Sequence, residues 1–363
     1  MWNPREHRGV SLLAGGVPCP PFSTAGKQLG SSDERDLFAW AVEAAGRMMP
    51  DAVLLENVRG LSMPRFAGYR QAVLDRFGEL GYRADWRLLE AKDFGVPQLR
   101  PRFILVALRE EFAPYFEWPE PTPTLHTVGA ALYDLMAANG WPGAEAWAKR
   151  AARIAPTVVG GSKKHGGPDL GPTRAKREWL SIGVDGLGIA DTAPGPETPV
   201  DFVPRLTNEM VARLQGWHGP GYEWDFGDRK GRKTTTYRQI GNAFPPPVAR
   251  AVGFAIASAL RKEGQPAGGH GADSQYRDEV YRALRDHGGY VTLAGLRKAL
   301  GGALDDAEIE RRIGFIRRDF EIEEQHRGGT ASYRLGDWRA FRGQEDHARH
   351  EAFASQRLRS KIS

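Results

Sequence analysis

The sequence predicts an α/β protein: a partial Rossmann-like sheet that is largely parallel, a small irregular region, and a C-terminal winged-helix-like domain. Three observations support this order. Up to about residue 120, short apolar runs typical of buried strands alternate with amphipathic helical segments. Proline, glycine and threonine then become frequent, and the alternation fades. Beyond residue 274, three helical segments precede a stretch that alternates as a β-hairpin does.

The first elements follow from hydrophobic periodicity. The apolar run at residues 9–18 predicts a buried strand that ends at Gly15 and Gly16. Residues 33–49 predict a helix, because Leu37, Trp40 and Ala41 recur at helical spacing. A second strand, a second helix and two further strands are expected at residues 52–57, 69–80, 84–94 and 102–108.

The later elements follow from caps, proline stops and turn residues. A helix is expected over residues 207–216, with Thr207 or Asn208 as its N-cap. QIGNAF predicts a turn, and an apolar helix follows the prolines from about residue 247 to 262. Gly328 and Gly329 are expected at the turn of the hairpin. The three helices before this hairpin are expected at residues 275–286, 293–300 and 305–318.

Changes in composition predict the domain boundaries. The α/β domain covers residues 1–121 and is resumed at 204–263, after an irregular region at 122–203. A glycine-rich linker at 264–273 leads to the winged-helix-like domain at 274–342 and to a flexible tail at 343–363.

The composition also limits the class of protein. Hydrophobic residues make up 41% of the 363 residues, and 26% are charged, which suits a soluble protein with a packed core. The single cysteine excludes an internal disulfide framework and a multi-cysteine zinc site, and it favours a reducing compartment. The net charge of +5 permits nucleic-acid binding. No apolar run approaches the roughly 20 residues of a membrane span, so we expect a cytoplasmic protein without a membrane partner.

Polar side chains reach one edge of the predicted sheet from three successive elements. Cys19 follows the first strand in a rigid Pro-Cys-Pro-Pro turn, Glu56 ends the next strand, and Gln98, Arg100 and Arg102 alternate into the last. Each has an ordinary alternative: a small buried thiol, a carboxylate that caps or pairs, and solvated arginines. Because open α/β sheets form ligand sites at the carboxyl ends of their strands, this combination predicts a catalytic site.

Five segments in this order resemble the DNA (cytosine-5) methyltransferase family over roughly residues 10–260. They are PCPPFSTAGKQ, ENVRG, QLRPR, RLTNEMVARLQGW and YRQIGNAFPPPVA. The resemblance implies methylation of cytosine C5 in double-stranded DNA with S-adenosylmethionine as the methyl donor, in a bacterial restriction-modification system. It implies no metal, and it places the enzyme in the bacterial cytoplasm, associated with the nucleoid.

The resemblance assigns catalytic roles to Cys19, Glu56, Arg100 and Arg102. The Cys19 thiolate, its pKa lowered by nearby arginines, would add to C6 of a cytosine flipped out of the duplex. Glu56 would hold the N3 and N4 edge of the base, Arg102 would bind its O2 side, and Arg100 would order the site. Donor-contacting positions match Pro18, Leu37, Asn242 and Ala243.

The resemblance also identifies residues 122–203 as a target-recognition region, for which a solvated basic loop is the alternative. Phosphate contacts there would add affinity but no sequence preference. The expected DNA contacts are Ser23, Lys27, Gln28, Asn57, Gln98, Lys163, Lys164, Arg174, Lys176 and Arg177. A second basic run at residues 228–238 is a further candidate. The winged-helix-like domain could bind DNA, or could serve in protein interaction or structure.

One part of the family pattern is missing. No glycine-rich DLFxGxGG-type segment precedes residue 10, so we expect the sheet to begin at the family's fourth strand. We therefore expect this chain alone not to bind S-adenosylmethionine, and to need an upstream segment or a partner chain. Two other functions stay open: a DNA-binding remnant without activity, and one subunit of a split methyltransferase.

Overall fold

The computed structural model describes residues 3–17, 35–122, 124–160, 168–218, 233–266, 276 and 278–338, without the side chains of residues 35–37. The chain forms two compact units. The first comprises Met1–Trp86, Leu105–Pro114 and Gly268–Ser363, and the second comprises Arg87–Ile104 and Tyr115–Ala267. The C-terminal helices therefore belong with the first α/β elements, whereas the sequence predicts a domain of their own.

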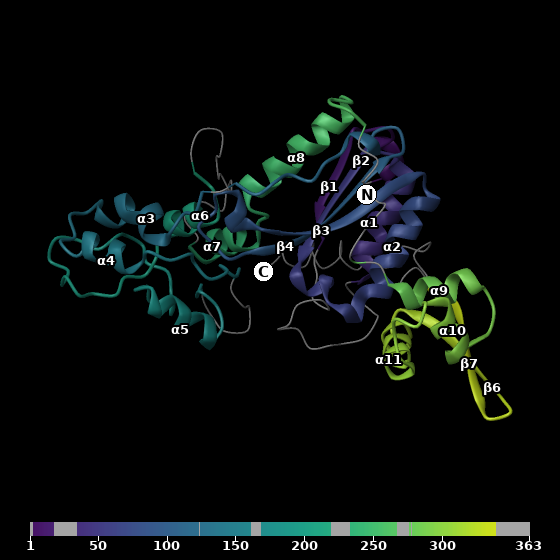
Figure 1. Ribbon diagram of the computed structural model, residues 1–363. Coiled ribbons are helices and arrows are strands. Elements are labelled where there is room, and N and C mark those ends of the chain that lie inside the picture. Colours follow the sequence, from purple (N-terminus) through teal and green to yellow (C-terminus); the bar gives the residue numbers. More distant parts are fainter. Residues whose placement is uncertain are drawn as a thin grey trace, which may run out of the picture. The chain divides into compact units, whose positions relative to one another are not determined.

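The first unit begins with a parallel strand–helix–strand arrangement (Figure 1). The strands β1 (Leu12–Gly16) and β2 (Ala52–Val58) pair in parallel, from Leu12 opposite Ala52 to Gly16 opposite Glu56. The helices of this part are α1 (Arg35–Met48) and α2 (Ala67–Glu79), as the periodicity predicts. Residues 52–55 of β2 are all buried, which explains their continuous apolar run.

The sheet is mixed, which corrects the prediction of a largely parallel sheet. Its strand order is β1-β2-β4-β3, with β3 at Tyr82–Glu90 and β4 at Pro101–Arg109. The amide of Arg109, at the end of β4, donates to the carbonyl of Asp51, just before β2 (3.1 Å). Likewise Ala91, just after β3, donates to Arg100, just before β4 (3.2 Å). The link between β3 and β4 is too short for the crossover that a parallel pair needs, so β4 runs antiparallel to both neighbours.

The C-terminal part of the first unit consists of three helices and a hairpin, as predicted. The elements are α9 (Glu279–His287), β5 (Val291–Thr292), α10 (Leu293–Ala299), α11 (Asp306–Ile316), β6 (Phe320–Arg327) and β7 (Thr330–Trp338). Gly328 and Gly329 have φ values of 57° and 78°, which a tight hairpin turn requires and which glycine adopts without strain. The winged-helix assignment itself stays a prediction. Ala72 of α2 belongs to the hydrophobic core of these helices.

The second unit is more regular than the sequence predicts. It contains α3 (Val128–Ala137), α4 (Ala144–Arg150), α5 (Thr173–Ser181), α6 (Asn208–Leu214), α7 (Lys233–Asn242) and α8 (Pro246–Leu260). Three of these lie in the region predicted to be irregular, around buried Trp141, Trp147 and Trp179. Their short length hides their periodicity, because helices of seven to ten residues depend on tertiary packing.

Two other predictions in this unit have opposite outcomes. Thr207 caps α6 through its side chain, which accepts from the amide of Met210, as the capping rule predicts. The QIGNAF segment, predicted to be a turn, instead continues α7 as far as Asn242. Buried Tyr237 and Ile240 explain this, because both are packed into the core of the unit.

The helices α7 and α8 are together long and apolar. Of the described residues, one stretch, Lys233–Leu260, could cross a membrane by length and composition alone. It consists of two helices that residues 243–245 separate, and core helices of soluble proteins meet the same criteria. The expectation of no membrane partner remains a prediction.

Candidate active site

Glu56 lies at the carboxyl end of β2, beside the end of β1. It stands opposite Gly16 in the parallel register, and its carbonyl accepts from the amide of Val17 (3.3 Å). A Cβ atom added to Gly16 would lie 3.2 Å from Oε2 of Glu56. The carboxylate therefore leans over the strand end that leads, three residues later, to Cys19. Cys19 lies outside the described residues, as do Pro18, Ser23, Lys27 and Gln28.

Asn57 holds the same strand end from within the protein. Its side chain is 2% exposed; Nδ2 donates to the carbonyl of Val17 (3.5 Å), and Oδ1 accepts from the amide of Val58 (2.7 Å). This placement differs from the expected contact with DNA, because a buried amide with two backbone partners has little to offer a ligand. Asn57 instead fixes Val17, the residue before Pro18 in the sequence.

Arg100 is a buried clamp in the second unit. It is 1% exposed, and its guanidinium donates to the carbonyls of Val158 (2.6 Å), Gly241 (2.7 Å) and Ala243 (3.0 Å). One side chain thus joins the QLRPR segment to two segments far away in the sequence. Arginine suits this task because it presents several donors in a fixed fork. This arrangement agrees with an ordering role rather than with contact to a substrate.

Gln98 completes the clamp together with Gln215, which sequence reasoning missed. The Gln98 amide is fully buried, donates to Oε1 of Gln215 (2.8 Å) and accepts from the amide of Val158 (2.8 Å). Gln215 in turn donates to the carbonyl of Ala243 (2.7 Å). The expected DNA contact of Gln98 is therefore not compatible with this placement. A polar residue within the otherwise apolar end of RLTNEMVARLQGW was the available signal for Gln215.

Two glycines let this clamp close. A Cβ on Gly241 would lie 2.8 Å from Cα of Gly160, and a Cβ on Gly160 would lie 2.0 Å from Oδ1 of Asn242. The two backbones cross in contact, so neither position tolerates a larger residue. Asn242 remains exposed between the two clamped carbonyls. An amide on a fixed backbone offers a donor and an acceptor, which fits the amino and carboxylate groups of a methyl donor.

Arg102 differs from Arg100 in its surroundings. It lies at the start of β4, is partly exposed, and donates through Nη1 to the carbonyl of Pro101 (2.8 Å). Arg102 belongs to the second unit, whereas Glu56 belongs to the first.

The basic residues of the recognition region fall into three groups. Lys163 and Lys164 lie outside the described residues. Lys176 is half-buried and paired with Asp169 (2.7 Å). Arg174 and Arg177 are exposed on α5, where Arg174 pairs with Glu178 (3.1 Å). Of the expected DNA contacts described in this region, the two whose side chains are exposed are Arg174 and Arg177 of α5.

Comparison with known proteins identifies the family. The model of the C-5 cytosine-specific DNA methylase family matches residues 4–258, which is well over half of the chain. The chain belongs to this family. The C-terminal helices lie beyond the matched range. Within the described part of the chain, no group of three His, Cys, Asp or Glu side chains could hold a metal ion.

Relatives with assigned functions support the same conclusion for this methyltransferase. It is 60% identical to the type II methyltransferase M.NaeI of Lentzea aerocolonigenes over 361 residues, 99% of this chain and 85% of that protein. It is 50% identical to M.NgoMIV of Neisseria gonorrhoeae over 262 residues, 70% of this chain and 80% of that protein. The chain is a C-5 cytosine DNA methyltransferase of the restriction-modification type. A DNMT2 structure from Spodoptera frugiperda, 17% identical with a TM-score of 0.42 and covering 68% of this chain and 80% of its own, is too distant to add to this.

Proposed function

We propose that this methyltransferase methylates cytosine C5 in double-stranded DNA through a covalent intermediate on Cys19. The observation that carries the proposal is the end of β1. There the Glu56 carboxylate leans over Gly16, and the Asn57 amide holds Val17, so the turn that bears Cys19 starts from a fixed point beside a carboxylate. A nucleophile next to an acidic group that can hold the base suits chemistry on a cytosine.

Cys19, Glu56 and Arg102 have different roles in the proposed reaction. Cytosine C5 is a weak nucleophile, and addition of the Cys19 thiolate to C6 makes it an enamine carbon that can attack a methyl group. Glu56 holds N3 and N4 and supports protonation at N3, while Arg102 binds O2. Loss of the C5 proton to solvent and expulsion of the thiolate then restore the aromatic base and free Cys19. The reacting base is inaccessible within a duplex, so it is flipped out first.

S-adenosylmethionine, when bound, would supply an electrophilic methyl group, and its sulfur would leave with the bonding electron pair as a neutral thioether. Asn242 would contact the donor from the clamped end of α7, with Ala243 beside it. Pro18 and Leu37 are the other expected donor contacts. Arg100, Gln98 and Gln215 act as positioning residues, since their polar atoms are engaged with the protein itself. The enzyme works in the bacterial cytoplasm on chromosomal DNA.

The role of Glu56 is tested by Glu56→Gln. Glutamine keeps the size of the side chain but cannot share a proton with N3, so kcat is expected to fall by about 10²–10⁴-fold, the range of acid–base contributions. The melting temperature is expected to change little, because Glu56 lies near the carboxyl end of β2 and is only partly buried. Glu145→Gln, at an exposed position on α4, is the matched control. Near-normal turnover by Glu56→Gln contradicts the assigned role.

We propose that residues 122–203 recognise the target and that Arg174 and Arg177 contact DNA phosphates. Exchange of the whole region is a poor test, because its core continues into α6 and α7. The double variant Arg174→Ala/Arg177→Ala is expected to weaken DNA binding and to lower the salt slope of log K by about 0.9 for each phosphate that is no longer neutralised. Both residues are exposed, so the fold should persist.

DNA affinity measured at several salt concentrations decides this. Arg261→Ala, just after α8, is the control, since it removes an exposed cation from outside residues 122–203. An unchanged salt slope in the double variant would place the DNA elsewhere.

A further inference from the structure

Arg70 of α2 is a buried cation that supports the segment following Glu56. Its side chain is 3% exposed, and Nη1 donates to the carbonyls of Leu61 (2.7 Å) and Met63 (2.8 Å). Both carbonyls belong to residues 59–66, which form the short 3-10 helices Arg59–Ser62 and Pro64–Phe66. Because these residues come directly after the ENV segment, Arg70 controls the path of the chain as it leaves Glu56 and Asn57.

The other side of Arg70 meets the C-terminal helices. Its guanidinium carbon lies 5.6 Å from the ring centroid of Tyr276, within the range of a cation–π interaction. The carboxylate of Asp278, 2% exposed, caps α9 by accepting from the amide of Tyr281 (2.9 Å). Burial lowers the pKa of Arg70 to about 10, and the opposing charge of Asp278 offsets part of this shift. The C-terminal helices thus supply the aromatic face and the counter-charge that a buried guanidinium needs.

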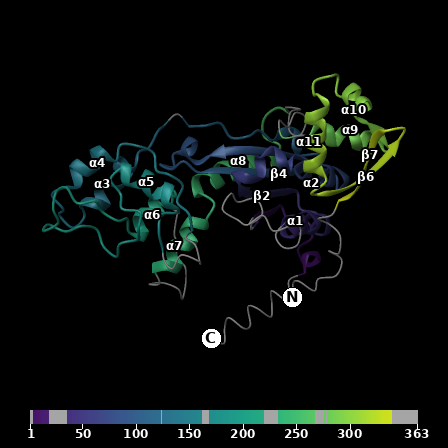
Figure 2. The same cartoon turned by 90° about the horizontal axis from the view of Figure 1, so that it is seen from below.

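Apolar contacts fix the same interface. Gly68 lies against Ile316, whose Cγ1 would be 3.2 Å from an added Cβ, and Tyr69 packs edge-on against Trp338 at 5.3 Å. Helices α9 and α11 lie beside α2 in both views (Figure 1 and Figure 2). A helix-turn-helix protein inserts the second helix of its motif into the DNA groove, and α11 holds that place in the order of helices. Here α11 packs on α2 and on residues 64–66 instead.

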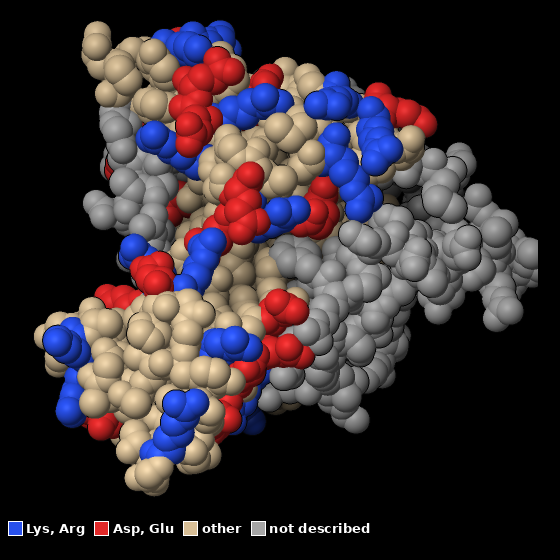
Figure 3. Space-filling model, turned by 90° about the vertical axis from the view of Figure 1, so that its right-hand side faces the viewer, with Lys and Arg blue, Asp and Glu red and all other residues tan. Residues whose placement is uncertain are grey.

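The charge distribution on the C-terminal helices and hairpin also argues against a DNA-reading role. On the face that Figure 3 shows, Lys and Arg side chains are interspersed with Asp and Glu side chains and do not gather into one basic patch. Arg311, Arg317 and Arg334 pair with Glu308, Glu324 and Glu323. A DNA-reading module would present unpaired cations to the phosphates. The C-terminal helices are therefore better suited to docking on α2.

We propose that Arg70 is a positioning residue for methyl transfer, through which the docked C-terminal helices hold residues 59–66 and thereby Glu56. This inference rests on the proposed role of Glu56. It gives the C-terminal helices, which lie beyond the range of the family model, a function in the reaction.

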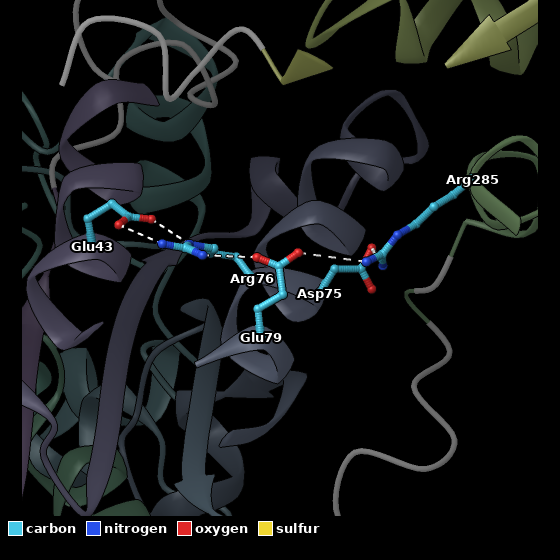
Figure 4. Close-up of polar contacts among 5 residues, drawn as sticks. All are labelled: Glu43, Asp75, Arg76, Glu79 and Arg285. Atoms are coloured by element: carbon cyan, nitrogen blue, oxygen red, sulfur yellow. Dashed lines mark hydrogen bonds and ion pairs between the residues drawn. The ribbon is translucent and has the colours of Figure 1, made fainter. Parts of the chain in front are cut away.

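A second set of contacts at the interface provides a control. Arg285 of α9 pairs with two carboxylates of α2, those of Asp75 (2.5 Å) and Glu79 (3.8 Å). Arg76 of α2 in turn pairs with Glu43 of α1 (2.6 Å; Figure 4). The Arg285 side chain is 43% exposed, so these pairs contribute little to stability. Arg285→Ala disturbs the rim of the interface without touching Leu61, Met63 or Arg70.

The test combines hydrogen exchange with covalent trapping. The full chain and its variants are followed by amide hydrogen exchange of residues 57–66. The second readout is the rate of adduct formation with DNA that contains 5-fluorocytosine, measured with S-adenosylmethionine and any upstream segment or partner chain that donor binding requires. Arg70→Met keeps the apolar stem and removes the donors. We expect exchange in residues 57–66 to rise, and the adduct rate to fall, by about tenfold or more, the equivalent of losing roughly one charged hydrogen bond. DNA affinity should not change.

Matched variants separate positioning from general destabilisation. Arg70→Lys keeps one donor and the charge, and should recover part of both readouts. Tyr276→Ala should show the same pattern as Arg70→Met with a smaller amplitude, whereas Tyr276→Phe and Arg285→Ala should resemble the parent protein. If Arg70→Met does not fold, the Tyr276 pair decides alone.

Two results overturn the proposal. One is an increase in exchange spread evenly over the first unit with an unchanged adduct rate, which means that Arg70 only stabilises the fold. The other is a Tyr276→Ala variant with parental exchange at residues 57–66, which means that the C-terminal helices do not act through Arg70. If the parent, supplied with the donor and whatever segment or partner donor binding requires, forms no adduct, the proposed function of Glu56 and Cys19 fails, while the exchange data still report on the contact.

Discussion

Cys19→Ser is expected to abolish methyl transfer and to leave DNA binding intact. An alcohol is scarcely ionised at neutral pH, whereas a thiol near cations is partly thiolate. We expect the rate to fall by about 10⁴-fold or more, the scale of removing a nucleophile. With S-adenosylmethionine and any upstream segment or partner chain that donor binding requires, the parent should form a covalent adduct with 5-fluorocytosine DNA that survives denaturing electrophoresis. The variant should form none.

The composition makes this test specific. Cys19 is the only cysteine in the chain, so a thiol adduct has a single possible position. Peptide mapping of the adduct should therefore return the segment around Cys19. An adduct that persists in Cys19→Ser would show that another residue is the nucleophile.

Arg100→Met is expected to destabilise the second unit by about 3–5 kcal/mol, because three carbonyls lose their buried donor. The methionine stem fills most of the space, but the carbonyls of Val158, Gly241 and Ala243 lose their donor. Each buried carbonyl left without a partner costs about 1–3 kcal/mol. Unfolding in urea, followed by the fluorescence of Trp147 and Trp179 in the core of this unit, measures the loss.

Arg102→Met is the matched control two residues away. Arg102 is partly exposed and donates to the adjacent Pro101 carbonyl, so stability should change by about 0.5 kcal/mol or less. Its turnover should fall nevertheless, because the O2 side of the base loses its partner. Equal stability losses in the two variants would refute the distinction between a clamping and a substrate-binding arginine.

Local patterns in the sequence predicted much of the fold. The apolar runs of β1 and β2, the amphipathic faces of α1 and α2, the Thr207 cap and the hairpin glycines all depend on residues close together in the chain. The five family segments are likewise recognisable from their residues and their order in the chain, so they indicated the family without any knowledge of the fold. Periodicity and capping act over one or two turns, so the sequence displays them directly.

The roles of single polar residues were harder to predict. Asn57, Gln98 and Arg100 look alike in the sequence, as polar residues at the sheet edge. In the structure Asn57 holds Val17, and Gln98 and Arg100 hold Val158. Their partners lie 40 to 60 residues away in the chain, beyond the reach of any local pattern.

The sequence by itself thus determined the family and the parallel start of the sheet, and it indicated the candidate reactive side chains. Only the tertiary structure decided which of these side chains are buried, that β4 runs antiparallel, and that the C-terminal helices dock on Arg70 of α2. The physical reason is burial: a polar group removed from water must find a partner, and that partner is chosen by packing in space rather than by distance along the chain.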